Sequence, residues 1–383
     1  MVTAIVTILM FLVMVSLHEF GHFIVGRLLK FNILEYSIGF GPAILKSKKT
    51  KTQYSLRVIP FGGYCKFDGE DGGSDDPGAF YKQAVWKRFL VVMAGGVFNV
   101  ILGFVLFLII VPMNSPVATN VVESVVEHSY LEQSGVLPGD KIVEINGHNI
   151  SFYDDITLYK QDFSKGSDVE LKVKRGEETL TFNTRATEQV IVQSITENGI
   201  DIATSINGYD SVEHYDYTED MPKDELTIGQ VSTYTNYLIG FKPVMEDINF
   251  GNVWREAWNE TRFVVKLVYQ SLWQMITGKI GVDQMAGPVG IVSEVNTAVN
   301  SGEDSFMYVL NLIALLTINL GVFNLLPIPA LDGGRLFFML IEMIRRKPIP
   351  PEKEGMVHAI GMMLLFGLII FVSFNDIMRL FGR

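Results

Sequence analysis

Cysteine is nearly absent from the 383 residues of this chain, in which Cys65 stands alone. A single thiol excludes a disulfide within the chain and says little about the compartment. The chain also lacks the marks of a cleaved signal peptide, because no Lys or Arg precedes its first apolar run and no small-residue cleavage site follows it. We therefore expect the N-terminal run to remain as a membrane span.

Basic residues are scarce in the middle of the chain. Residues 113–304 carry thirteen Lys or Arg against thirty Asp or Glu, whereas residues 27–88 carry eleven against six. The acidic part offers no basic surface suited to nucleic acid. The sequence therefore predicts no nucleic-acid partner.

Long apolar stretches are abundant, and 48% of the residues are hydrophobic. Four stretches approach the roughly 20 residues that cross a bilayer, within the segments 1–30, 89–112, 305–334 and 356–383. Basic clusters at 46–51 and 345–347 follow the first and third spans, and the positive-inside rule places both in the cytoplasm. The acidic part and both termini then lie outside. Small residues at 94–96 in the second span allow another helix to approach closely.

The first span carries the sequence His18-Glu19-Phe20-Gly21-His22. On a helix, His18 and His22 share one face, so both imidazoles can reach one metal ion. Glu19 lies about 100° further round, where it can accept a proton from water at the metal without being a ligand. This spacing also arises by chance, and a lone buried histidine is more often a hydrogen-bonded core residue. Ionisable residues at bilayer depth cost about 2.5–3.5 kcal/mol each and are functional by default, which favours a metal site.

A catalytic zinc site usually has three protein ligands and one open position. The candidate third ligand is Asp332, in the run Asn324-Leu325-Leu326-Pro327-Ile328-Pro329-Ala330-Leu331-Asp332-Gly333-Gly334 after the third span. Broken helix at membrane depth is tolerated where it lines a cavity, and the charge pattern places Asp332 toward the cytoplasm, at the depth of the histidines. Asn324 offers an amide for a substrate backbone or a developing oxyanion. Alternatively, Asp332 caps a helix and Asn324 bridges two spans.

Residues 31–88 predict a hairpin on the cytoplasmic side, with short strands at 36–42 and 54–64. Its exposed edge would accept an extended peptide as an added strand, or the hairpin is merely structural. The sequence favours neither alternative. The segment 335–355 is expected to be a cytoplasmic loop.

The external part begins with a run at 134–147 that resembles the G-L-x-x-G-D-x-I-x-x-I-N-G pattern of PDZ domains. We expect an α+β PDZ domain over 113–187, which either binds a peptide ligand or obstructs access to the membrane site. Residues 188–304 are expected to be external, and residues 188–250 among them partly folded. Within them, 251–277 predict an amphipathic helix, either at the outer membrane interface or in the core of the soluble domain. Gly287 to Ile291 predict a loop or break.

Four features together resemble the site-2 protease family, and most of all its bacterial RseP-like branch with four spans. They are the PDZ insertion, His18-Glu19-x-x-His22, Gly287-Pro288-Val289-Gly290 and Asn324-x-x-Pro327-x-Pro329-x-Leu331-Asp332-Gly333. The resemblance implies a polytopic α-helical zinc metalloendopeptidase, with His18, His22 and Asp332 as Zn²⁺ ligands and Glu19 as the catalytic carboxylate. It also implies that Asn324, and with a weaker match Asn319, hold substrate, and that 54–67 form a membrane-associated hairpin that pairs with it.

The same resemblance implies the biological setting. The expected substrates are single-span membrane proteins cut within the bilayer, such as anti-sigma factors, and remnant signal peptides. The expected place is the bacterial cytoplasmic membrane, with the PDZ domain outside and the active site near the cytoplasmic side. The chain has one clear PDZ signature, so it does not match a mechanism in which two PDZ domains filter access to the active site.

Two other functions would also bury such ligands. A membrane zinc transporter or metal-sensing receptor needs neither Glu19 nor a PDZ insertion, and a protease-dead chaperone would not need the intact motif. Zinc-dependent cleavage in detergent, measured with and without Glu19, separates the three.

Overall fold

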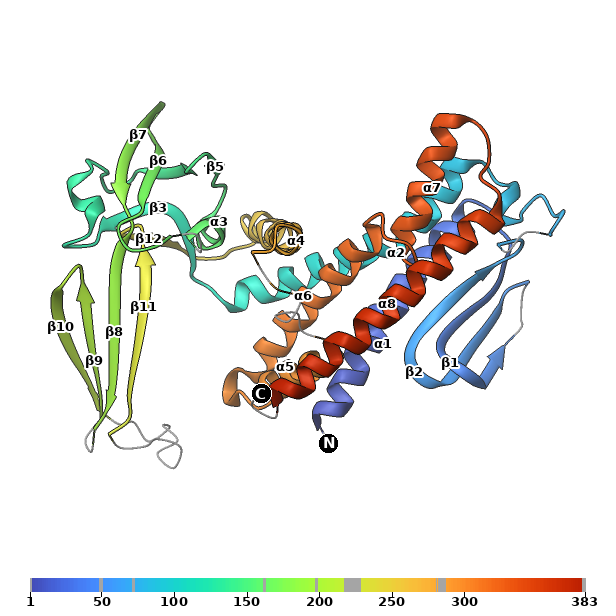
Figure 1. Cartoon of the computed structure of the whole chain (residues 1–383), viewed down its shortest axis with the longest axis horizontal. Helices are drawn as coiled ribbons and strands as arrows, with labels where there is room; N and C mark the ends of the chain where they lie inside the picture. Colours follow the sequence, from blue (N-terminus) through green and yellow to red (C-terminus); the bar gives the residue numbers. More distant parts are fainter. Residues whose placement is uncertain are drawn as a thin grey trace. The chain divides into compact units, whose positions relative to one another are not determined.

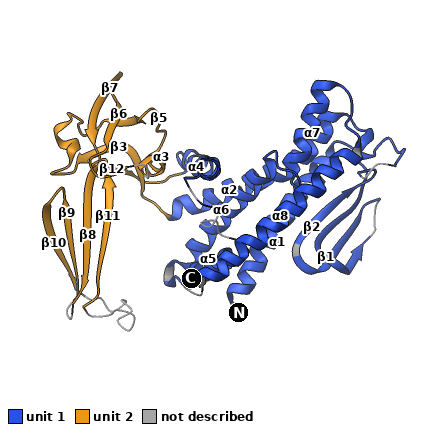
Figure 2. Cartoon of the chain, in the orientation of Figure 1, with its two compact units in different colours: residues 1–113, 250–383 blue, residues 114–249 orange. Residues whose placement is uncertain are grey.

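The computed structural model describes residues 2–47, 51–70, 73–160, 163–196, 199–216, 229–279, 281 and 287–380. Residues 48–50 of the predicted basic loop lie outside the described residues. The chain divides into two compact units, residues 1–113 with 250–383, and residues 114–249 (Figure 2). The second unit is thus an insertion into the first, between the second and third long apolar helices.

Four helices of the first unit are long and apolar enough to cross a membrane, as the sequence predicts. They are α1 (Val2–Leu28), α2 (Val85–Met113), α6 (Ser305–Leu325) and α8 (Pro351–Leu380) (Figure 1). Their apolar residues occur all round the helix, which is typical of helices surrounded by lipid and by one another. The unit is therefore a multi-pass membrane protein.

Helix α2 packs against both α1 and α6. A Cβ atom on Gly21 of α1 would lie 2.5 Å from the carbonyl oxygen of Ala94, and one on Gly321 of α6 would lie 2.6 Å from the carbonyl oxygen of Gly96. Glycine is needed because the helix backbones touch at these points. The small residues at 94–96 therefore admit a neighbouring helix on two sides.

Strands β1 (Ile33–Ser47) and β2 (Gln53–Phe67) pair as an antiparallel hairpin, and both are longer than the predicted strands. Phe31, Ile33 and Phe67 at its base pack into a cluster with Phe23 of α1. Further along, burial raises the pKa of Glu35, but hydrogen bonds from Ser55 and Arg57 outweigh it and lower that pKa to about 2. The hairpin is thus tied to the helices by an apolar base and held together internally by a charged network.

Three further helices complete the first unit, and two of them correct the sequence analysis. Helix α5 (Pro288–Val299) occupies the predicted loop or break at 287–291, because a proline at the first helical position starts a helix instead of ending one. Helix α7 (Asp332–Arg345) occupies part of the predicted loop 335–355. Short 3₁₀ turns lie at η1 (Phe80–Lys82) and η6 (Gly302–Asp304).

The third of these helices is α4 (Val253–Ile276), within the predicted amphipathic segment. It packs against α2 and α6 and belongs to the first unit, so it is not a core helix of the inserted unit. Its exposed face carries Trp254, Trp258 and Trp273. A position at the membrane interface remains the prediction.

The second unit consists of two sheets. One has the order β12-β3-β4-β6-β7, with β5 paired to β4, and the other has the order β10-β9-β8-β11. The first contains β3 (Val117–Val125), β4 (Lys141–Ile145), β5 (His148–Asn149), β6 (Asp168–Arg175), β7 (Glu178–Arg185) and β12 (Phe241–Glu246), with α3 (Tyr153–Tyr159) and η2 (Tyr130–Gln133) beside them. The second contains β8 (Thr187–Ile195), β9 (Gly199–Ile206), β10 (Tyr209–Asp216) and β11 (Val231–Leu238). Strand β12 joins the first sheet from outside the segment 113–187.

Candidate metal centre

The two histidines of the first span face one another on α1. His18 and His22 are both buried, and their Nε2 atoms are 3.2 Å apart. Helical spacing of four residues produces this arrangement, because side chains at i and i+4 lie one above the other. Two imidazole nitrogens therefore converge on one point inside the helical unit.

Asp332 completes the group from the other end of the chain. It begins α7, after the proline-containing connection from α6, and its Oδ2 atom lies 3.1 Å from Nε2 of His18 and 3.2 Å from Nε2 of His22. Oδ2 is buried and, among the described residues, has no hydrogen-bond donor apart from the nitrogens that face it. The structure thus brings together the three side chains that the sequence singles out as ligands.

This triangle has the dimensions of a zinc site. Tetrahedral ligands with bonds of about 2.0–2.1 Å lie about 3.3 Å from one another, and the three edges here measure 3.1 to 3.2 Å. Two imidazoles and one carboxylate are also a usual donor set for catalytic zinc. The residues present therefore fit the metal.

Helix α2 contacts the Nδ1 atoms of both histidines, on the side of each ring away from Asp332. Nδ1 of His22 lies 2.9 Å from the carbonyl oxygen of Val91, so it carries the proton and leaves the lone pair of Nε2 for a metal. Asn99 is fully buried, with its amide nitrogen 3.4 Å from Nδ1 of His18 and its amide oxygen without a partner among the described residues. A 180° rotation of this amide would let the oxygen accept from Nδ1, which again frees Nε2. The sequence analysis did not identify Val91 or Asn99 in this role.

Glu19 lies between the histidines and the hairpin. Its carboxylate accepts a hydrogen bond from the backbone of Cys65 on β2, and a Cβ atom on Gly63 would lie 3.5 Å from its Cγ. Cys65 itself is outside the ligand triangle, and burial raises the pKa of its thiol, which disfavours the thiolate that binds metals. The carboxylate of Glu19, next to the cluster of His18, His22 and Asp332 (the metal group), is thus held by β2.

The two predicted substrate-binding residues are not part of this cluster. The amide nitrogen of Asn324 donates to the carbonyl oxygen of Leu320 at 2.9 Å, one turn back in α6. Asn319 lies on the same helix and is half-buried. Hydrogen bonds of the described residues include none between either asparagine and the three ligand side chains. Their role remains a prediction.

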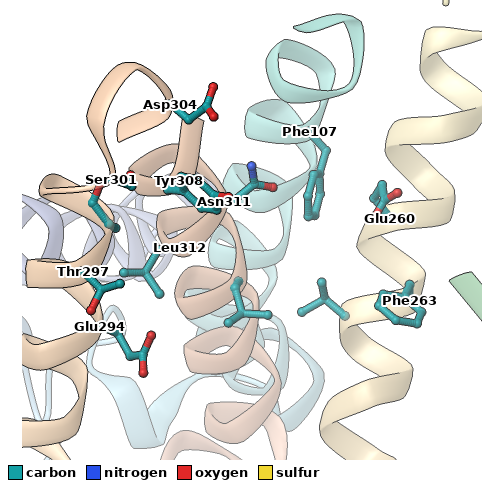
Figure 3. Close-up of a pocket in the computed structure, with 13 residues that line it drawn as sticks. Phe107, Glu260, Phe263, Glu294, Thr297, Ser301, Asp304, Tyr308, Asn311 and Leu312 are labelled. Carbon is teal, nitrogen blue, oxygen red and sulfur yellow. Dashed lines mark hydrogen bonds between the residues drawn. The ribbon is translucent and has the colours of Figure 1, made fainter. Parts of the chain in front are cut away.

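A cavity among the described residues lies elsewhere. It measures about 680 Å³ and is lined by residues of α2, α4, α5 and α6, including Phe107, Phe263 and Tyr308 (Figure 3). Its lining contains none of the three ligand side chains. The metal group is instead closely packed by α2, where a Cβ atom on Gly95 would lie only 2.4 Å from Nε2 of His22.

Known proteins resemble the chain over almost its whole length. The sequence model of peptidase family M50 matches residues 6–368. A protein of Clostridium acetobutylicum for which zinc metalloprotease activity is proposed is 34% identical over 380 residues, which cover 97% of this chain and 96% of the relative. Two proteins named zinc metalloprotease RasP are also similar: that of Oceanobacillus iheyensis at 27% identity, covering 100% of both chains, and that of Bacillus licheniformis at 28%, covering 99% of both.

Proposed function

The chain belongs to peptidase family M50 and is an intramembrane zinc metalloprotease, and from this premise we propose that it cuts the transmembrane segments of single-span membrane proteins. The proposed substrates are membrane-bound anti-sigma factors, cut in regulated intramembrane proteolysis, and remnant signal peptides. Members of both classes have one apolar helix in the membrane, and we propose that its peptide bonds reach the depth of His18, His22 and Asp332.

The observation that carries the proposal is the triangle of ligand atoms. His18 and His22 lie on α1, which is long and apolar enough to span a bilayer, and Asp332 lies at the start of α7. We assign His18, His22 and Asp332 as the zinc ligands. When bound there, zinc lowers the pKa of a water molecule to about 7 and polarises a peptide carbonyl. Three protein ligands leave one position open, which distinguishes catalytic from structural zinc sites.

Glu19 is the residue that we assign to proton transfer. It follows His18 on α1, and the Cys65 backbone holds its carboxylate beside the imidazoles. In this position the carboxylate takes a proton from the attacking water and gives it to the leaving amine. Asn99 and the carbonyl of Val91 orient the two imidazoles during this transfer.

A substrate helix hides its carbonyl groups in internal hydrogen bonds, so it must unwind before cleavage. Within the described strands, β1 and β2 pair only with each other. The first part of β2, at 54–56, is paired with β1 on both sides, whereas residues 63–67 are paired on one side and leave an edge that can pair with an extended peptide. Gly63 and Cys65 of this strand lie against Glu19. We propose that the unwound substrate adds to the hairpin beside Glu19, with Asn324, and with Asn319 as a weaker candidate, holding its backbone.

The charge pattern supports the proposed orientation. By the positive-inside rule, the basic residues at 46–51 and 345–347 favour a cytoplasmic position for the metal end of α1. We propose that residues 114–249 lie outside a bacterial cytoplasmic membrane. We propose that the segment 113–187, with β12, is a PDZ domain that binds a peptide end or obstructs access to the membrane site.

Replacing Glu19 with glutamine tests the proposal. The amide keeps the size of the side chain but cannot act as a base, so the full-length variant in detergent should retain zinc and lose at least about a hundredfold in the cleavage rate of a model single-span substrate. Glu352→Gln on α8, where Glu352 is exposed, is the matched control and should cleave like the wild type.

Cleavage at the wild-type rate by the Glu19 variant would refute the assignment of Glu19. A wild-type chain that hydrolyses soluble peptides but leaves every membrane-embedded substrate intact would refute the proposed substrate class.

A further inference from the structure

The connection that delivers Asp332 to the metal group is held in an unusual conformation. Ala330, two residues before Asp332, has φ of +79°, a left-handed conformation that a side chain with Cβ disfavours. The next turn is also tight, because a Cβ atom on Gly333 would lie 1.8 Å from the carbonyl oxygen of Leu326. Conformations of this kind persist only where surrounding groups hold them.

The group that holds Ala330 comes from the last helix. The backbone N–H of Ala330 donates to Nδ1 of His358 on α8, at 3.0 Å. The ring is closely packed there, since a Cβ atom on Gly334 would lie 3.0 Å from its Cε1 atom. One turn further along α8, a Cβ atom on Gly361 would lie 2.4 Å from Cβ of Pro329. Helix α8 is thus fitted directly against the connection.

The hydrogen bond from Ala330 also determines the tautomer of the His358 imidazole. Nδ1 can accept from Ala330 only if it carries no proton, so the imidazole is neutral and its proton is on Nε2. Nε2 is buried without a hydrogen-bond partner among the described residues, and the nearest carboxylate oxygen, of Glu354, is 4.0 Å away. Among the described residues, the His358 side chain therefore makes its hydrogen bond with Ala330, from whose backbone N–H it accepts.

We propose that His358 is a positioning residue for the metal centre: its Nδ1 atom holds Ala330 in the left-handed conformation and so fixes the place of the Asp332 carboxylate. The proposal rests on the assignment of Asp332 as a zinc ligand. It gives α8 a part in the metal site although α8 supplies none of the three ligands.

The test is the rate at which full-length protein in detergent loses zinc to a chelator. His358→Asn keeps an acceptor oxygen close to the position of Nδ1, whereas His358→Gln moves its oxygen toward the position of Nε2 and His358→Phe has none. Because groups that orient metal ligands affect metal affinity by about 10- to 100-fold, zinc loss should be about tenfold faster in the Gln and Phe variants and close to wild type in the Asn variant. His148→Phe, at an exposed histidine of the inserted unit, is the matched control for loss of an imidazole.

A second variant covers the case in which His358→Phe folds poorly. Ala330→Gly adopts the left-handed conformation without strain, so it should reduce the effect of His358→Phe in the double variant. Equal zinc loss from all three His358 variants would overturn the proposal by showing a packing effect, and wild-type retention by all three would overturn it by showing no role. If Asp332→Ala itself retained zinc, the ligand assignment would fail instead, and the two failures are thereby distinguished.

Discussion

Replacing Gly95 of α2 with alanine would direct a methyl group at both imidazoles of the metal group. The added Cβ atom would lie 2.4 Å from Nε2 and 2.5 Å from Cε1 of His22, and 2.8 Å from Cε1 of His18. Ordinary contacts of a Cβ atom begin at 3.4 Å, so the ring of His22 must move by about 1 Å, the difference between 3.4 and 2.4 Å. Metal–ligand distances tolerate only about 0.2 Å.

The displacement of the His22 ring and the gain in helix propensity predict opposite effects of Gly95→Ala on the metal site. Alanine is favoured over glycine inside a helix by about 0.8–1.0 kcal/mol, so propensity alone predicts a more stable variant with normal zinc binding. The structure predicts the opposite for the metal site: zinc loss, and a cleavage rate lower by about a hundredfold, since misplacement by about 1 Å costs that much. Gly367→Ala on α8 shares the propensity gain but has nothing within 4 Å of the new methyl group, and is the matched control.

The assay is zinc per chain after dialysis against a weak chelator, together with cleavage of a membrane-embedded substrate. Gly367→Ala should match the wild type in both measurements. Full zinc content and full activity in Gly95→Ala would show that α1 and α2 are not as close as the structure places them, and would refute the reasoning.

Three further predictions follow from the site and the inserted unit. Asp332→Ala should lose zinc with the fold intact, as measured by zinc per chain and elution volume in detergent; normal zinc content would exclude Asp332 as a ligand. Asn99→Leu should bind zinc about tenfold more weakly, because Nδ1 of His18 loses its acceptor, whereas Asn99→Asp should not; equal affinities would exclude this role. Arg175 donates hydrogen bonds of 2.7 Å to Asp140 and thereby lowers its pKa, so the pair stabilises the folded state above the ordinary pKa of 3.8 and that stability is lost as the pH falls through the lowered pKa. Arg175→Met should accordingly increase hydrogen exchange in β4 and β6 at pH 7, with the difference from wild type shrinking below pH 3.8; a difference that is independent of pH would contradict it.

The membrane helices and the clustering of His18, His22 and Asp332 could be predicted from the sequence. The helices and the histidine pair were predictable because they depend on local spacing. Apolar runs of sufficient length predict α1, α2, α6 and α8, and the four-residue spacing of His18 and His22 places both on one face. Asp332 was predictable because prolines break a helix next to an ionisable residue at the same depth as the histidines.

The sequence at 287–290 was ambiguous, because a proline can end one helix or, at the first helical position, begin the next, as Pro288 does in α5. The remaining features depend on contacts between residues that are distant in the sequence. The closeness of Asn99 to His18 depends on the rotation of α2 against α1, for which the small residues at 94–96 were the only signal. The hydrogen bond between Ala330 and His358 joins residues 28 positions apart, on either side of α7.

The zinc K-edge X-ray absorption spectrum of the full-length protein tests the central claim most directly. Ligation by His18, His22 and Asp332 predicts a first shell of nitrogen and oxygen at about 2.0–2.2 Å, with outer-shell scattering from two imidazoles. A sulfur shell at about 2.3 Å, which Cys65 would have to supply as the chain's single cysteine, or scattering from fewer than two imidazoles, would contradict it.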